Sequence, residues 1–196
     1  MPVSAVCISR ALGAGGEEVG RLVADALGFR YVDEEIVLAA AEKEGLDPEL
    51  LATAERMRTG LSRLGEIDIV TGGGFDELQR SLIRGAIQET VAAGKVVIVA
   101  HAASIALAGD DRVLRVLVTA SPEARARRLV QTEQLDEQEA AKQIDRSDKA
   151  RAAYIKRFYN VDRELPSDYD LVVGTDRLSA DDACTLVLDA VAALDS

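Results

Sequence analysis

Three glycines near the start of the chain have the spacing of a ligand-binding loop. Gly13, Gly15 and Gly16 follow an apolar run at residues 3–8 and precede a helical pattern that ends at Gly28. A glycine-rich turn lets the backbone approach a ligand closely, and the N–H groups and positive dipole of a helix N-terminus attract phosphate. The sequence therefore predicts a phosphate-binding loop. The alternative is a glycine-rich turn that binds nothing.

This loop departs from two phosphate-binding motifs. In the triphosphate motif G-x-x-x-x-G-K-S/T, the Lys reaches the phosphates and the hydroxyl binds magnesium. With the second glycine of that motif at Gly15, Gly16 stands at the Lys position and Glu17 at the hydroxyl position, and Arg10 replaces the first glycine. The dinucleotide motif G-x-G-x-x-G fails as well, because Glu18 stands where its third glycine belongs.

A dinucleotide site nevertheless stays open as an alternative. Asp33 follows the loop at about the distance of an acid that binds ribose, which suggests an NAD(P)-binding oxidoreductase. Against it, residues 9–12 separate the first strand from the glycines, whereas a dinucleotide loop begins directly after its strand. Asp33 is equally suited to a ligand site at a strand end and to capping the next helix.

The basic residues provide further candidates for anion binding. In a helix expected over residues 136–158, Arg151 lies on the apolar side, where an arginine calls for an anionic partner. Arg151 and the adjacent Arg127 and Arg128 are therefore the best candidates for gripping phosphate. The other basic residues of that helix are interpreted as a solvated face. They are Lys142, Arg146, Lys149, Lys156 and Arg157.

The single histidine, His101, comes directly after the apolar strand at residues 95–100. It could contact a ligand at the strand end, but a structural role is favoured. No cysteine or second histidine accompanies it, so no metal site formed by protein side chains is predicted.

Composition limits the function classes. The 196 residues are 48% hydrophobic and 29% charged, which fits one globular domain. A net charge of −11 and a pI near 4.6 argue against nucleic-acid or anionic-membrane partners. The sequence contains no apolar run long enough for a membrane span and no signal-peptide pattern. Cys7 and Cys184 are expected to be buried free thiols in a reducing cytoplasm.

Alternating strands and helices predict a three-layer α/β domain with a mainly parallel sheet of five strands. The strands are expected at residues 3–8, 31–32, 95–100, 113–119 and 169–173. Helices are expected after the loop, from Asp33, over 47–57, over 78–94, from Ser121, over 136–158 and from Ser179, with a mobile connector or surface loop at 58–74.

The assembled motifs resemble the cytidylate-kinase-like family of P-loop kinases. Members read I-S-R-x-x-G-S-G-G-R-E-I near the start, which is similar to residues 8–19 here. Further family motifs resemble residues 31–37, 97–103, 148–158 and 169–179. The similarity covers nearly the whole chain and is weakest at residues 45–75.

The resemblance implies a P-loop kinase fold in a single domain over 1–196, with a helical acceptor-binding insertion at 45–95 and a lid region at 121–160. It implies phosphoryl transfer from ATP, with Mg²⁺, to a small acceptor such as a CMP-like nucleoside monophosphate. The implied nucleotide-binding residues are Ser9, Gly13, Ala14, Gly15, Gly16, Glu17 and Thr175. The implied catalytic cations are Arg10, Arg127, Arg128 and Arg151, and the implied acceptor contacts are Asp33, His101 and Lys149.

Three departures from the family pattern support a different class of function. The family commonly has Arg or Lys where Glu17 stands, arginine where His101 stands, and glycine at Ala100 and Ala102. A carboxylate at the loop repels phosphates, and lost cations weaken transition-state stabilisation. A catalytically impaired protein that binds nucleotide or regulates a partner is therefore the first alternative to an active kinase.

Overall fold

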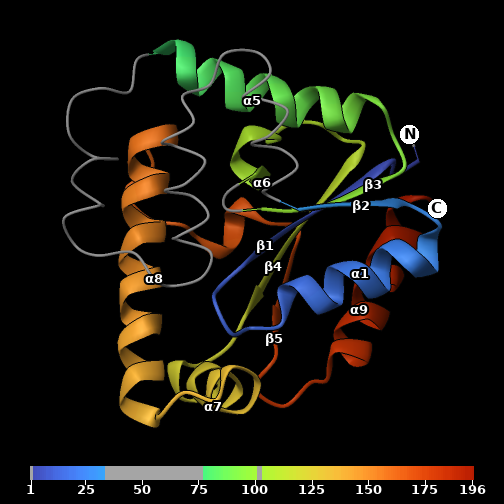
Figure 1. The fold of residues 1–196 in the computed structure, drawn as a ribbon. Coiled ribbons are helices and arrows are strands. Elements are labelled where there is room, and N and C mark those ends of the chain that lie inside the picture. Colours follow the sequence, from blue (N-terminus) through green and yellow to red (C-terminus); the bar gives the residue numbers. More distant parts are fainter. Residues whose placement is uncertain (1, 34–76, 101–102) are drawn as a thin grey trace.

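Five parallel strands form the centre of the structure, a computed structural model that describes residues 2–33, 77–100 and 103–196 (Figure 1). The strands are β1 (Ala5–Arg10), β2 (Arg30–Asp33), β3 (Val96–Val99), β4 (Val113–Thr119) and β5 (Leu171–Gly174). They lie in the order β2-β3-β1-β4-β5, and every neighbouring pair is parallel. Their carboxyl ends therefore meet at one edge of the sheet.

The central strands are buried on both faces because they are almost continuously apolar. Every residue of β1 and β3 is buried. Ile8 of β1 pairs with Val99 of β3 on one side and with Val116 of β4 on the other. This register places the end of β1, and the loop that follows it, in the middle of the sheet edge.

Seven helical segments surround the sheet in the described parts of the chain. They are α1 (Gly16–Leu27), α5 (Glu77–Ala92), α6 (Ala103–Ala106), α7 (Pro122–Glu133), α8 (Glu137–Tyr159), the 3₁₀ turn η1 (Pro166–Asp168) and α9 (Ala180–Leu194). Local capping explains several helix starts: the side chains of Ser121, Asp136 and Ser179 accept hydrogen bonds from the first turns of α7, α8 and α9.

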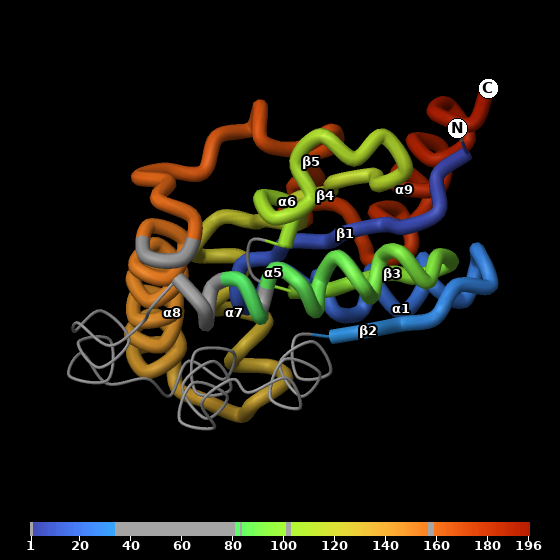
Figure 2. The backbone as a smooth tube through the Cα atoms, turned by 90° about the horizontal axis from the view of Figure 1, so that it is seen from above, coloured from blue at the N-terminus to red at the C-terminus, as the bar shows by residue number. Residues whose placement is uncertain are grey.

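Two hydrophobic cores cover the two faces of the sheet. Helices α1 and α9 pack on one face, with Val19, Val23 and Val187 fully buried. Helices α5, α6 and α8 supply the other core, in which Ile87 and Ile155 are buried. Figures 1 and 2 show α8 at the side of the molecule where the glycine loop and α7 lie, away from the two chain termini. The polar groups described below lie at the edge formed by the carboxyl ends of the strands.

The structure confirms the predicted three-layer α/β fold and refines its details. All five strands are parallel rather than mainly parallel, and β1 continues through Arg10 instead of ending at residue 8. The short helix α6 was not predicted. The helices expected from Asp33 and over 47–57, and the connector at 58–74, lie outside the described residues. In the described part of the chain, no helix is long and apolar enough to cross a membrane.

Candidate phosphate-binding site

The glycine loop joins β1 to α1 through two left-handed residues. Gly13 has φ +75° and Gly15 has φ +82°, conformations that favour glycine. The N–H group of Ala14 donates to the carbonyl of Ala11 at 3.0 Å, which closes the turn. Gly15 is the N-cap of α1 and has no side chain with which to cap the helix. The first-turn N–H groups of α1 are thus available to an anion.

Arg10 lies over the first residue of α1. A Cβ atom added to Gly16 would lie 2.3 Å from Arg10 Cβ and 2.6 Å from Arg10 Cγ, so position 16 accepts only glycine without a shift of the arginine. The Arg10 side chain is 4% exposed, and its Nε donates to Glu17 Oε1 at 2.6 Å. The triphosphate motif has its lysine at position 16. Arg10 therefore fills the space beside that position.

Three further arginines hold the backbone carbonyls of the loop. Nη1 of Arg151 donates to the carbonyl of Arg10 at 2.9 Å. Nη1 of Arg125 lies 3.5 Å from the carbonyl of Leu12, and Nη1 of Arg128 donates to the carbonyl of Gly13 at 3.2 Å. These bonds tie α7 and α8 to the loop from one side. Because the carbonyl oxygens are engaged there, the loop is held in one conformation next to the N-terminus of α1.

Thr175 connects the loop to the end of β5. Its hydroxyl donates toward the carbonyls of Ala14, at 2.8 Å, and Thr119, at 3.2 Å, and accepts from Arg128 Nη1 at 3.0 Å. Nη2 of Arg128 also donates to the Thr175 carbonyl. Thr175 is buried, so these bonds are shielded from water. Thr175 and Arg128 thus fix the loop on the side of β4 and β5.

A buried polar cluster lies beneath the loop on the side of α8. Both Nε and Nη2 of Arg151 bond to the carboxylate of Glu164, and the hydroxyl of Tyr169 donates to the same carboxylate. Burial, followed by the bond to Glu164, raises the pKa of Tyr169 to about 12. Ser9 is fully buried, with Oγ 3.5 Å from Oγ of Ser104. The Ser9 hydroxyl thus lies behind the loop.

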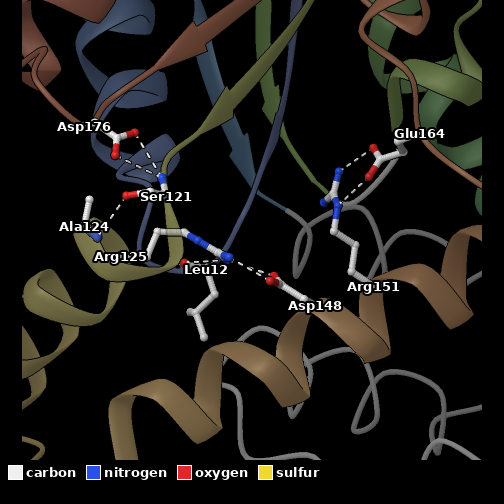
Figure 3. Close-up of polar contacts among 8 residues, drawn as sticks. All are labelled: Leu12, Ser121, Ala124, Arg125, Asp148, Arg151, Glu164 and Asp176. Atoms are coloured by element: carbon white, nitrogen blue, oxygen red, sulfur yellow. Dashed lines mark hydrogen bonds and ion pairs between the residues drawn. The ribbon is translucent and has the colours of Figure 1, made fainter. Parts of the chain in front are cut away.

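Arg125 and Asp148 join α7 to α8 and line a cavity. Nη1 and Nη2 of Arg125 bond to the two carboxylate oxygens of Asp148 at 2.8 and 2.7 Å (Figure 3). The cavity has a volume of about 370 Å³, and both residues line it together with Arg151, Arg163 and Glu164. Within the described residues, the buried Nε of Arg125 has no hydrogen-bond partner. Asp162 lines the cavity too, so three arginines face three carboxylates there, and Leu117 and Ile155 add apolar surface.

Other predicted site residues lie away from the loop. Arg127 is exposed on α7 and lines an outer groove with Val130 and Ile144. Lys149 pairs with Asp145 at 2.7 Å, and both side chains are more than half exposed. In the same basic face of α8, Lys142 is 60%, Lys156 69% and Arg146 42% exposed, as expected for a solvated face. The side chain of Arg157 lies outside the described part of the structure. His101 lies outside the described residues.

The position of Asp33 argues against a dinucleotide site. Asp33 ends β2, and β3 lies between β2 and β1. In the dinucleotide fold, the strand that carries the ribose-binding acid is the direct neighbour of the strand before the glycine loop. Asp33 is therefore one strand too far from Gly13 and Gly15 for that arrangement.

The roles of Arg125, Asp148 and Glu164 were not predicted from the sequence. Helical spacing could have indicated the first two, because Arg125 lies three residues before Arg128 and Asp148 three before Arg151, on shared helix faces. The residues next to Glu164 in the sequence form no pattern that would have indicated its bond to Arg151.

The magnesium implied by the family resemblance fits this loop as a partner of a bound nucleotide. Among the described residues, no group of three or more His, Cys, Asp or Glu side chains could hold a metal ion on its own. Magnesium at nucleotide sites, however, is held by one or two carboxylates together with the phosphates of the substrate. Glu17, 39% exposed in the first turn of α1, is the carboxylate of the loop that would fit this part.

Comparison with known structures supports the fold assignment. An uncharacterized protein from Eubacterium ventriosum superimposes with a TM-score of 0.74 at 16% identity, covering 97% of this chain and 98% of that one. Shikimate kinase from Bacteroides thetaiotaomicron gives a TM-score of 0.54 at 15% identity, covering 96% and 98%. A gluconokinase from Sinorhizobium meliloti gives 0.55 at 14% identity, covering 99% and 94%. These similarities establish the P-loop kinase architecture.

Sequence comparison gives the family. Cytidylate kinase from Methanocorpusculum labreanum is 24% identical, covering 96% of this chain and 97% of that one. Cytidylate kinase from Methanopyrus kandleri is 27% identical, covering 91% and 88%. The model of the cytidylate kinase-like family matches residues 5–177, so the loop, both arginine-bearing helices and β5 all fall within the match. The chain belongs to the cytidylate kinase-like family.

Proposed function

We infer that this chain is an ATP-dependent phosphotransferase that acts on a nucleoside monophosphate or another small acceptor. The observation that carries this inference is the loop held at the N-terminus of α1 by Arg125, Arg128 and Arg151. A rigid loop with available N–H groups suits phosphoryl transfer, in which positioning and charge neutralisation supply the catalysis. The family assignment and the kinases among the structural neighbours support the same reaction class.

The donor phosphates would lie on the loop. The backbone of Gly13, Ala14, Gly15 and Gly16 would cradle them, and Arg10 would supply positive charge in place of the missing lysine. Arg128 and Thr175 would keep the loop in position through the bonds that they make to it. Magnesium bound with the nucleotide would neutralise charge on the β- and γ-phosphates, and Glu17 would be its protein ligand.

The acceptor would occupy the cavity beside the loop. Its wall carries three arginines and three carboxylates, so an acceptor there would meet both hydrogen-bond donors and acceptors: Arg125, Arg151, Arg163, Asp148, Asp162 and Glu164. The curated relatives named cytidylate kinase support a nucleoside monophosphate. Roles for Asp33, His101, Lys149 and Arg127 stay predictions. The buried free thiols Cys7 and Cys184 support a reducing location, for which we propose the cytoplasm.

A nucleotide-binding protein without catalytic activity is the second candidate. Two observations favour it: Gly16 stands where the triphosphate motif has its lysine, and Glu17 forms an ion pair with the nearby cation Arg10. Such a protein would bind ATP but transfer no phosphate.

Direct measurement of phosphate transfer distinguishes the two candidates. The purified chain is incubated with ATP, Mg²⁺ and one of CMP, dCMP, UMP, AMP or GMP, and the nucleotides are separated by ion-exchange chromatography. Formation of a nucleoside diphosphate from the acceptor supports the kinase. As a control for contaminating enzymes, Arg128→Lys should reduce the rate about tenfold or more, because it loses the two-pronged bond to Thr175. Lys142→Met, on the solvated face of α8, should keep the wild-type rate.

A further inference from the structure

Arg10 and Glu17 form an asymmetric ion pair at the loop. The Arg10 side chain is 4% exposed and packs over Gly16, whereas the Glu17 side chain is 39% exposed. Their contact joins Arg10 Nε to Glu17 Oε1 at 2.6 Å. The arginine is thus confined by packing, and the carboxylate is the partner that can rotate toward solvent. If the ion pair opens, the Glu17 side chain is therefore the one that moves.

The pair places a negative charge where the proposed function requires phosphates to bind. Glu17 lies in the first turn of α1, one residue after the helix begins. A nucleoside triphosphate without metal carries about four negative charges, so it meets repulsion from Glu17 and competes with it for Arg10. A carboxylate oxygen is, however, a preferred ligand of Mg²⁺. The same side chain that opposes the free nucleotide is therefore suited to the metal-bound nucleotide.

We propose that Glu17 makes nucleotide binding conditional on a divalent cation. Without the cation, Glu17 stays on Arg10 and keeps the loop neutral. When a nucleotide arrives with its cation, Glu17 leaves Arg10 for the cation, and Arg10, which packing keeps in place, presents its charge to the phosphates. This inference rests on the proposed nucleotide site and goes beyond it, because it assigns a regulatory effect on binding to the carboxylate at position 17, where the triphosphate motif has a hydroxyl and the family commonly has Arg or Lys.

Calorimetric titration with a non-hydrolysable ATP analogue tests the proposal without relying on activity. Each protein is titrated once with EDTA and once with excess Mg²⁺. For the wild type, Mg²⁺ should lower the Kd about 100-fold or more. In Glu17→Gln, the Kd without metal should fall about tenfold, and the gain from Mg²⁺ should shrink about tenfold or more. Glu17→Thr, which restores a hydroxyl, should also bind the metal-free analogue better than the wild type does.

Glu18→Gln is the matched control. Glu18 is exposed in the same helix turn, so its removal changes the net charge and the helix-dipole interaction equally. It should keep the wild-type response to Mg²⁺. The proposal is overturned if Glu17→Gln keeps the wild-type response, or if Glu18→Gln weakens it as much. If the analogue binds to none of the folded proteins, with or without Mg²⁺, the proposed function fails and this inference fails with it.

Discussion

Arg151 and Glu164 bond at two points, with Arg151 Nε 2.8 Å from Oε2 and Nη2 2.6 Å from Oε1. The remaining terminal nitrogen of Arg151 donates to the carbonyl of Arg10, where β1 passes into the glycine loop. An arginine predicted to grip phosphate thus connects α8, the segment before β5 and the loop. Its contacts with the protein itself show that it positions the loop.

Glu164→Gln should destabilise the fold by about 2–4 kcal/mol. The variant removes the charge opposite Arg151, whose side chain is only 9% exposed. Removing one partner of a buried ion pair lowers the free energy of unfolding, because the other charge stays buried without compensation. Urea denaturation followed by circular dichroism measures the free energy of unfolding. Asp162→Asn is the control, because Asp162 and its partner Lys156 are both largely exposed and their pair should contribute little. Equal stability losses in the two variants would contradict the account of Arg151 and Glu164.

Tyr169→Phe should cost stability at neutral pH, and this cost should shrink in strong alkali. The pKa of Tyr169 is raised by burial from 10.0 to about 12, so the folded state holds its proton longer than the unfolded state does. The stabilisation is complete below pH 10 and is lost as the pH rises to about 12. The measurement is the difference in unfolding free energy between wild type and variant from pH 8 to 12. A difference that stays constant over this range would refute the assignment.

Gly16→Ala should destabilise the protein by about 1–3 kcal/mol, because its new methyl group overlaps with the Arg10 side chain. Gly16→Lys, which restores the residue of the triphosphate motif, should be destabilised as well and should bind ATP no better than the wild type. Gly85→Ala in α5 is the control. A Cβ there meets nothing within 4 Å among the described residues, and helix propensity favours the change by up to about 1 kcal/mol. A Gly16→Lys variant that is stable and binds ATP more tightly would show that Arg10 does not replace the lysine.

Thr175→Val should weaken ATP binding about tenfold and destabilise the fold by about 1–3 kcal/mol. The hydroxyl joins the loop carbonyl of Ala14 to Arg128 in a buried site, so its loss leaves these groups without that partner. The hydroxyl of Thr185 in α9 donates to the carbonyl of Asp181 in the preceding helix turn at an exposed position, which makes Thr185→Val a control. If both variants bind ATP as the wild type does, Thr175 has no part in holding the loop.

The sequence predicted those features that depend on neighbouring residues. Caps at Ser121 and Ser179, the left-handed Gly28 after α1 and the buried run of β3 are local, and all are confirmed. The β1–α1 loop was likewise located from its glycines, because their conformations are set by local backbone geometry.

The partners of the arginines could not be predicted in the same way. Arg125 reaches Leu12 across 113 residues, and Arg151 reaches Arg10 across 141. These contacts depend on how α7 and α8 dock against the sheet edge, which hydrophobic periodicity does not specify. Arg127 and Arg128 were both predicted to bind phosphate, but adjacent residues point in different directions on a helix, and Arg125 shares the face of Arg128 instead.

The central claim is that the loop from Gly13 to Gly16 binds the phosphates of a nucleotide, and amide NMR tests it most directly. The ¹⁵N-labelled protein is titrated with a non-hydrolysable ATP analogue and Mg²⁺ while the backbone amide shifts are recorded. The account predicts that the largest shifts fall on the amides of residues 13–18, with smaller ones at Arg128 and Thr175. Saturable binding that shifts other amides and leaves residues 13–18 unchanged, or no binding at all, would contradict it.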